Sequence, residues 1–165
     1  MGKKGVSPVV ATVLIITLTV VTIGIIAPTV IKFTNENLDK SKECFDIMDD
    51  IKLEDLGYTC TTNGETSFSV RIENAAITGF KVGLIASGSS TVRDVSGGTS
   101  ISDMKMYGAT MGDLLSVPGV GEVKTYVVSG DYDRVEVFPI LESGRTCDDG
   151  DSIKIATSCT GGGIQ

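Results

Sequence analysis

The hydrophobic and polar positions divide the chain into an uncharged N-terminal stretch and a longer, mixed part. The 27 residues between Lys4 and Lys32 contain no charged side chain. A helix that crosses a membrane needs roughly 20 consecutive apolar residues. The pattern therefore predicts an apolar helix of membrane-spanning length over residues 6–31.

The helical pattern continues beyond the uncharged stretch. Ile31, Leu38 and Phe45 recur at intervals of seven, with charged residues between them. That spacing returns to the same face of a helix after two turns. We therefore predict a single long helix over residues 6–52, of which only residues 6–31 are uncharged.

From Gly57 onward, apolar and polar residues alternate with the period of β-strands. Asn63-Gly64 between two such runs predicts a hairpin over residues 57–73. Further strands are predicted at residues 77–87, 122–129, 133–141 and 152–158. Residues 87–102 are predicted to form a Ser/Gly loop with at most a short strand, and residues 103–121 are ambiguous. The fold class is therefore α+β: a long N-terminal hydrophobic helix followed by an antiparallel β-sandwich-like domain over residues 53–165.

The uncharged stretch has four interpretations. A secretory signal peptide has a shorter apolar region, roughly 7–15 residues, and ends in a small-residue cleavage site that residues 28–31 do not provide. A buried helix of a soluble protein is a poor fit to a run of this length without a charge. A plain membrane anchor fits, and the positive-inside rule then places Lys3 and Lys4 in the cytoplasm. In the fourth interpretation, the helix spans the membrane only temporarily and later packs against copies of itself.

Charge and cysteines indicate where the remaining chain resides. All 21 acidic residues follow Lys32, whereas 11 of the 14 basic residues do, so this part carries a net charge of −10. A surface of that sign repels nucleic-acid phosphates.

The four cysteines also follow the apolar stretch, at Cys44, Cys60, Cys147 and Cys159. An even number of cysteines beyond a membrane segment predicts two disulfides in an oxidising exterior. Of the three connectivities, we favour the local one, Cys44–Cys60 and Cys147–Cys159; the alternative is four buried free thiols.

The sequence KKG-VSPVVATVLIITLTVV resembles the N-terminus of archaeal type IV pilins. The resemblance implies a leader over residues 1–5 that a leader peptidase removes between Gly5 and Val6. Its recognition residues would be Lys3, Lys4, Ser7 and Pro8. It further implies an assembly ATPase, a membrane platform protein and a filament of identical subunits whose helices form the core. The residues expected in that core are Val10, Val13, Leu14, Thr17, Val20, Val21, Gly24, Ile25 and Pro28.

One departure from the bacterial members of this group changes the expected basis of assembly. Bacterial pilins carry Glu as the fifth mature residue, whereas the corresponding residue here is Val10. Charge pairing between that Glu and a neighbouring amino terminus therefore cannot operate. Assembly is expected to depend on apolar packing of the helices alone.

The sequence does not predict an enzyme. Because the chain has no His, Ser-His-Asp and Cys-His catalytic sites are excluded. Asp131 and Asp133, and the group Asp148, Asp149 and Asp151, could offer oxygens to Ca²⁺, but their spacing is not that of an EF-hand, and Asp and Gly are ordinary turn residues. No cofactor and no metal are expected.

The prediction from sequence is a structural subunit of an extracellular, pilus-like filament, made as a membrane-inserted precursor and used for adhesion. The alternative is a surface-binding module anchored by a single span that never polymerises. The related archaeal swimming filament is a second alternative, although its subunits usually lack the Ser-Pro start. A minor or tip subunit is a third.

Overall fold

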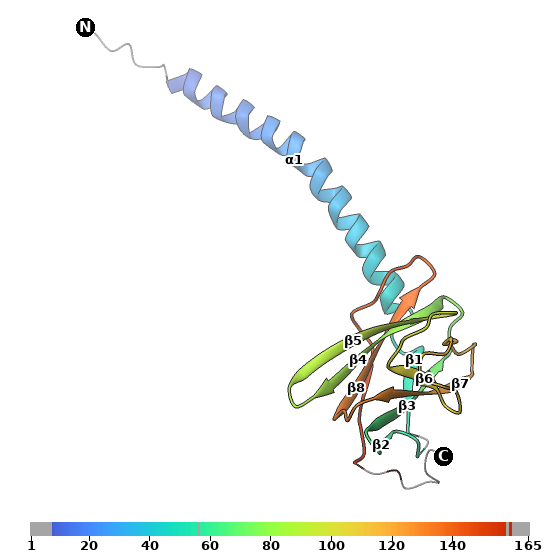
Figure 1. Cartoon of the computed structure of the whole chain (residues 1–165). Coiled ribbons are helices and arrows are strands. Elements are labelled where there is room, and N and C mark those ends of the chain that lie inside the picture. Colours follow the sequence, from blue (N-terminus) through green and yellow to red (C-terminus); the bar gives the residue numbers. More distant parts are fainter. Residues whose placement is uncertain (1–7, 56, 158, 160–165) are drawn as a thin grey trace. The chain divides into compact units, whose positions relative to one another are not determined.

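The structure is a computed structural model. It describes residues 8–55, 57–157 and 159. By its contacts the chain divides into two compact units, with the division between Phe45 and Asp46. Among the described residues, the first unit contains one long helix and the second contains nine β-strands (Figure 1). The α+β class predicted from the sequence is therefore confirmed.

The first unit contains helix α1, Pro8–Phe45. Its first residue in the structure is a proline, which suits the first turn of a helix because the missing N–H would have no partner there. The helix continues through Pro28, although proline removes one backbone hydrogen bond. Helix α1 ends before the predicted boundary at residue 52, and residues 46–49 form a turn.

The second unit consists of two antiparallel sheets. The first has the strand order β1-β3-β7-β6, and β2 also pairs with β3. The second has the order β5-β4-β8-β9. The strands of the first sheet are β1 (Ile51–Glu54), β2 (Cys60–Thr62), β3 (Glu65–Ile72), β6 (Met104–Met106) and β7 (Val123–Ser129). Those of the second are β4 (Ile77–Ala86), β5 (Ser89–Ser96), β8 (Arg134–Leu141) and β9 (Asp151–Lys154).

Two hairpin turns of the same kind set the register in the two sheets. Asn63 and Gly64, with φ of 54° and 78°, join β2 to β3 as predicted. Ser87 and Gly88, with φ of 48° and 83°, join β4 to β5 in the same way. Two consecutive residues with positive φ form the turn that best matches the twist of a hairpin. The prediction of a loop over residues 87–102 was therefore wrong for its first part, where β5 pairs with β4 over eight residues.

Strand β1 lies where the sequence pattern predicted the end of the helix and the start of the domain. Ile51 and Leu53 are buried, whereas Lys52 between them is exposed. This alternation is that of a strand, and β1 pairs with β3 from Ile51↔Ile72 to Glu54↔Ser69. Four residues are too few for the period to be distinguished from a continuing helix in the sequence alone.

The core of the second unit lies between its two sheets. Tyr126 on β7 stacks beside Phe68 on β3, with ring centroids 5.7 Å apart. It also meets the edge of Phe80, on β4 of the other sheet, at 5.4 Å. All three side chains are fully buried. An aromatic cluster of this geometry holds the two sheets face to face, so the second unit is a β-sandwich.

An ion pair joins the two sheets near one edge. Arg93 on β5 donates two hydrogen bonds to Asp103, which precedes β6, at 2.7 and 3.3 Å. This pairing holds the pKa of the Asp103 carboxyl below its usual range, against the opposing effect of partial burial. The pair therefore ties the edge strand of the second sheet to the first sheet.

Tyr126 makes the stability of the sandwich sensitive to alkaline pH. Its hydroxyl donates a hydrogen bond to the Ser116 carbonyl at 2.7 Å. Burial raises the pKa of Tyr126 far above its ordinary value, and the negative charge of Glu122 adds a smaller rise. The phenol thus ionises near pH 10 only in the unfolded chain, so stability is lost as pH rises above that value. Between about pH 9 and pH 11 we expect the native chain to lose roughly 1.4 kcal/mol more than Tyr126→Phe.

Chemical unfolding of the full-length chain in detergent, at several pH values for both proteins, measures this difference. The phenylalanine variant keeps the ring but removes the titrating hydroxyl together with its hydrogen bond to Ser116. The comparison therefore uses the change in unfolding free energy between pH values for each protein, and not its value at one pH. Parallel pH profiles for the two proteins would show that Tyr126 does not carry the effect.

Candidate functional site: the exposed apolar surface of helix α1

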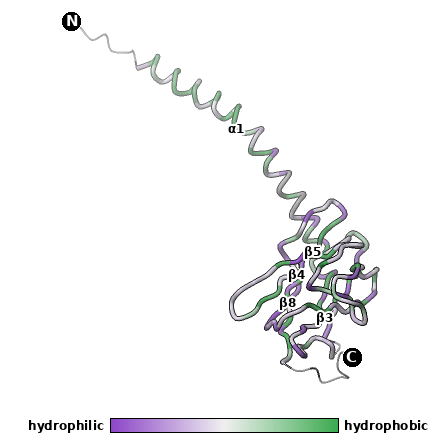
Figure 2. The backbone as a smooth tube through the Cα atoms, in the orientation of Figure 1, coloured by the Kyte–Doolittle hydropathy of each residue, from purple (hydrophilic) through white to green (hydrophobic). Residues whose placement is uncertain are grey.

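The first two-thirds of α1 present an apolar surface in which Lys32 is the first charged residue. We use the term apolar helix surface for the side chains of residues 9–33 that are large, hydrophobic and more than half exposed. In Figure 2 green dominates this part of the helix, and purple appears only in its later part. The members are Val9, Val10, Val13, Leu14, Ile15, Ile16, Leu18, Val20, Val21, Ile23, Ile25, Ile26, Val30, Ile31 and Phe33.

This surface surrounds the helix instead of forming one stripe. Three or four neighbouring positions, such as Val13 to Ile16, cover every direction around a helix of 3.6 residues per turn. The segment Pro8–Asn35 is long and apolar enough to cross a membrane, and its most apolar part is not buried inside the described chain. A helix that is apolar all round is stable only in lipid or among other helices. Its partners must therefore be a membrane or further helices.

Four threonines in this part of the helix donate their hydroxyl groups to carbonyls of the same helix. Thr12 bonds the Val9 carbonyl at 2.9 Å and Thr19 bonds the Ile16 carbonyl at 2.8 Å. Thr22 bonds the Leu18 carbonyl at 2.7 Å, and Thr17 bonds both Val13 and Leu14. Because each hydroxyl is satisfied within its own helix, the side chain presents chiefly its methyl group to the surroundings. These threonines therefore do not interrupt the apolar surface.

No neighbour among the described residues lies close enough to Gly24 to require its small size. A Cβ built at this position would have no atom within 4 Å. In the interior of a helix, glycine costs roughly 1 kcal/mol relative to alanine. Small residues at such positions let a neighbouring helix approach closely. Gly24 thus favours helix–helix packing over a role in the fold of this chain.

The structure places the predicted site residues as follows. The leader over residues 1–5, its cleavage position between Gly5 and Val6, and Ser7 lie outside the described residues, and Pro8 is the first residue of α1. All residues predicted for a filament core lie on α1 and are exposed. These are Val10, Val13, Leu14, Thr17, Val20, Val21, Gly24, Ile25 and Pro28.

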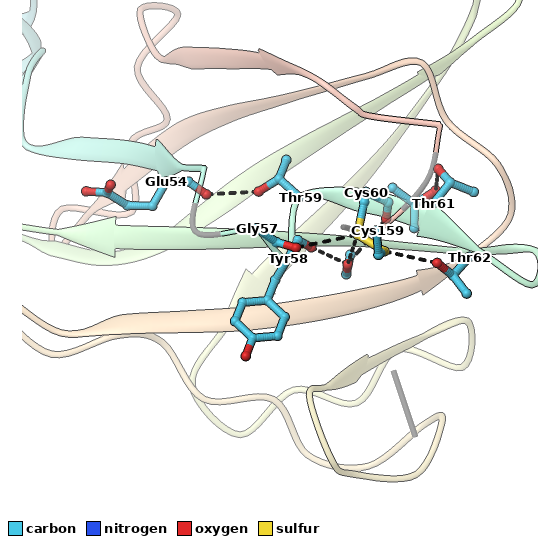
Figure 3. Close-up of a disulfide and its surroundings, with 10 residues drawn as sticks. Glu54, Gly57, Tyr58, Thr59, Cys60, Thr61, Thr62 and Cys159 are labelled. Atoms are coloured by element: carbon cyan, nitrogen blue, oxygen red, sulfur yellow. Dashed lines mark hydrogen bonds between the residues drawn. A yellow bond between two sulfur atoms is a disulfide. The ribbon is translucent and has the colours of Figure 1, made fainter. Parts of the chain in front are cut away.

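The presence of two disulfides is confirmed, but the predicted pairing is wrong. Cys60 is bonded to Cys159, across 99 residues of sequence and with Cα atoms 5.1 Å apart (Figure 3). Cys44 and Cys147 are disulfide-bonded too, so no cysteine is free. Neither Cys44–Cys60 nor Cys147–Cys159 therefore exists.

A contact between distant segments explains the pairing. The Thr61 backbone N–H donates to the Ala156 carbonyl at 2.9 Å, which brings the chain after β9 alongside β2. Cys60 and Ala156 form a parallel bridge there. The Thr62 hydroxyl also donates to the Cys159 sulfur at 3.0 Å (Figure 3). No local spacing in the sequence indicates this neighbourhood.

Two of the aspartates considered as Ca²⁺ ligands bond to backbone groups instead. Asp133 accepts a hydrogen bond from the Ser87 N–H at 2.8 Å, and Asp151 accepts one from the Leu53 N–H at 2.8 Å. Asp148 and Asp149 are exposed. Within the part of the chain that the structure describes, no three His, Cys, Asp or Glu side chains are grouped as a metal site.

A polar pocket beside the β2–β3 turn is a second candidate site, which no pattern in the sequence predicts. Its lining comes from residues 61–64, residues 131–133, Ile155 and Thr157. Because these segments are far apart in the sequence, no motif marks the pocket. Of the lining residues, the sequence pattern marks only Asp131 and Asp133, as oxygen groups that could bind Ca²⁺.

Comparison with known proteins assigns no family. No protein-family model matches the chain, and no curated protein matches it. What the molecule itself shows is an apolar, exposed N-terminal helix joined to a disulfide-bonded β-sandwich. These features indicate an extracellular protein, secreted or membrane-anchored, whose helix packs with lipid or with partner helices.

Proposed function

We propose that the chain is the structural subunit of an extracellular, type IV pilus-like filament. The precursor sits in the membrane through residues 6–31, with Lys3 and Lys4 on the cytoplasmic side. A leader peptidase cleaves between Gly5 and Val6. An assembly ATPase and its membrane platform then move subunits from the membrane into a fibre, with the helices inside and the β-sandwich units outside.

The observation that carries this proposal is the apolar helix surface. It surrounds the helix, and its threonines at positions 12, 17, 19 and 22 satisfy their own hydroxyl groups. A helix of this kind can exchange lipid neighbours for copies of itself without exposing a polar group. Little hydrophobic free energy is gained in that exchange, so close packing repeated along the fibre must hold it together. Gly24, which has open space around it, is where we expect the closest helix–helix approach.

Nothing in this function requires catalysis, and the role we propose is structural, with attachment to surfaces as its use. The disulfides suit a shell that faces an oxidising exterior.

A subunit with no charge along residues 8–31 has no ionic pairing to direct its register, unlike a pilin with a core Glu. Shape and the position of small residues would direct it instead.

The decisive experiment identifies the N-terminus of the chain in sheared surface filaments. Filaments are sheared from the native cells, and the N-terminal peptide and the non-reduced mass of the chain are measured. A chain that begins at Val6, recovered in filaments and lighter by the hydrogens of two disulfides, supports processing, export and assembly together.

Other outcomes point to the alternatives. A chain that retains Lys3 and Lys4 and occurs only in the membrane fraction overturns the filament proposal and favours a single-span anchored binding module. Recovery at trace levels in filaments built of another protein indicates a minor subunit.

A further inference from the structure

A pocket of about 420 Å³ lies in the β-sandwich unit. Pockets that bind small molecules commonly measure roughly 300–1,000 Å³. Three segments line it: the end of β2 with its turn, the loop before β8, and the chain after β9. All the lining residues belong to the second unit, so the pocket does not depend on α1.

Backbone hydrogen bonds join the three segments into a closed frame. The Gly130 N–H donates to the Gly64 carbonyl at 2.7 Å, which ties the loop to the turn. The Ile155 N–H donates to the Asp133 carbonyl at 3.0 Å, and the Thr61 N–H donates to the Ala156 carbonyl at 2.9 Å. Each segment is thus bonded to both others. A frame of this kind keeps its shape without a ligand, which reduces the ordering cost of binding.

The aromatic wall of the pocket is also held in place. Gly130 has φ of 116°, and a Cβ there would lie 3.1 Å from the Tyr132 ring. Glycine therefore lets the ring lie against the backbone. The Tyr132 N–H donates to the Thr66 hydroxyl at 3.1 Å, and that hydroxyl donates to the Gly130 carbonyl at 2.7 Å. Tyr132 and the buried Ile155 give the pocket an apolar area beside its polar groups.

Three polar side chains of the lining are available for a ligand. Within the described chain, Asn63, Asp131 and Thr157 make no side-chain hydrogen bond, and all three are exposed. They supply an amide that donates and accepts, a carboxylate that accepts and a hydroxyl that does both. By contrast, Asp133 already accepts a hydrogen bond from Ser87.

This set of groups limits the class of ligand. The lining includes two carboxylates and no Lys or Arg, so an anion such as phosphate would be repelled. A bare metal ion is disfavoured because the residues that the structure describes offer no group of three suitable ligands. A purely apolar ligand would leave the polar groups desolvated without partners. A neutral molecule rich in hydroxyl groups fits, because each hydroxyl can donate to a carboxylate and accept from an amide, and its C–H groups can contact an aromatic ring.

We infer that this pocket binds a neutral saccharide unit, with Asp131, Asn63 and Thr157 as its hydrogen-bonding residues. This inference goes beyond the filament proposal and stands without it. If the chain does form filaments, each subunit presents one such pocket, and many weak sites on one fibre bind a glycan-coated surface with high avidity.

Titration of the full-length chain with neutral methyl glycosides tests the inference. The chain is kept in a detergent without a sugar headgroup, such as lauryldimethylamine oxide, because maltoside detergents would compete. The probes are the methyl glycosides of glucose, galactose, mannose and N-acetylglucosamine, and binding is followed through the methyl resonance of Ile155. At least one glycoside should shift this resonance in a saturable manner.

Two variants make the result specific. Asp131→Ala should weaken the binding of that glycoside at least tenfold, since a charge-assisted hydrogen bond is lost. Asp149→Ala removes another exposed carboxylate, one outside the pocket, and should leave binding unchanged. The inference is overturned if no glycoside shifts Ile155, or if both variants behave alike. It is also overturned if methylammonium or Ca²⁺ shifts Ile155 in an Asp131-dependent manner while every glycoside fails.

Discussion

Replacing Val20 with aspartate is expected to abolish filaments and to deplete the chain from the membrane. Val20 is 64% exposed and lies near the middle of the uncharged stretch. A carboxylate at the centre of a spanning helix costs about 2.5–3.5 kcal/mol of insertion free energy. That cost corresponds to a shift of roughly 100-fold in the insertion equilibrium.

The expected effect on a filament is larger than the effect on insertion. Every subunit would bury the same carboxylate among apolar neighbours, and no basic residue lies between Lys4 and Lys32 to pair with it. A buried charge without a partner either remains costly or takes up a proton. Since the same defect recurs in each subunit, the fibre cannot avoid it by rearranging at one position.

Matched variants separate the loss of apolar packing from general damage. Val20→Thr should assemble normally, because its hydroxyl can bond back to its own helix as those of Thr19 and Thr22 do. Val92→Asp makes the same replacement at an exposed valine on β5 and should also assemble. The measurements are the yield of sheared filaments and the amount of chain in the membrane fraction. Normal filament yield from Val20→Asp would contradict the proposal that this surface forms the core.

The features that the sequence predicted well are those with strong local signals. A run of uncharged residues sufficed to predict the apolar first part of α1, and Asn63-Gly64 sufficed for the β2–β3 hairpin. Ser87-Gly88 forms the same kind of turn with similar positive φ values, but serine seldom adopts that conformation, so the composition indicated a loop. Strand β1 was missed because its alternation covers only four residues.

The features that the sequence did not predict depend on contacts between distant segments. The bond between Cys60 and Cys159 follows from the bridge between β2 and the chain near Ala156. The polar pocket depends on the same bridge and on the loop at residues 131–133. Spacing along the chain carries no information about such neighbours, and four cysteines allow three pairings. Spacing along the chain favours the local pairing, but the bridge between Cys60 and Ala156 brings Cys159 to Cys60.

Removal of the Cys60–Cys159 disulfide should destabilise the β-sandwich by about 2–4 kcal/mol. The bond closes a loop of 99 residues, and the entropy that a cross-link removes from the unfolded chain increases with loop length. Domains of ordinary size are stable by only about 5–15 kcal/mol, so this is a substantial fraction. In a thermal melt, Cys60→Ala/Cys159→Ala should unfold roughly 10 °C below the native chain.

The single variants test the pairing as well as its energy. If Cys60 and Cys159 are partners, Cys60→Ala, Cys159→Ala and the double variant should all melt at nearly the same temperature, because either change breaks the one bond. Alkylation of Cys60→Ala should then label Cys159 and no other cysteine. Labelling of Cys44 would instead restore the local pairing and contradict the topology.

Because Cys60 and Cys159 flank two walls of the polar pocket, the double variant should also weaken glycoside binding at temperatures where the sandwich is still folded. A loss of stability without loss of binding would mean that the backbone hydrogen bonds of Thr61 and Ile155 hold the pocket alone.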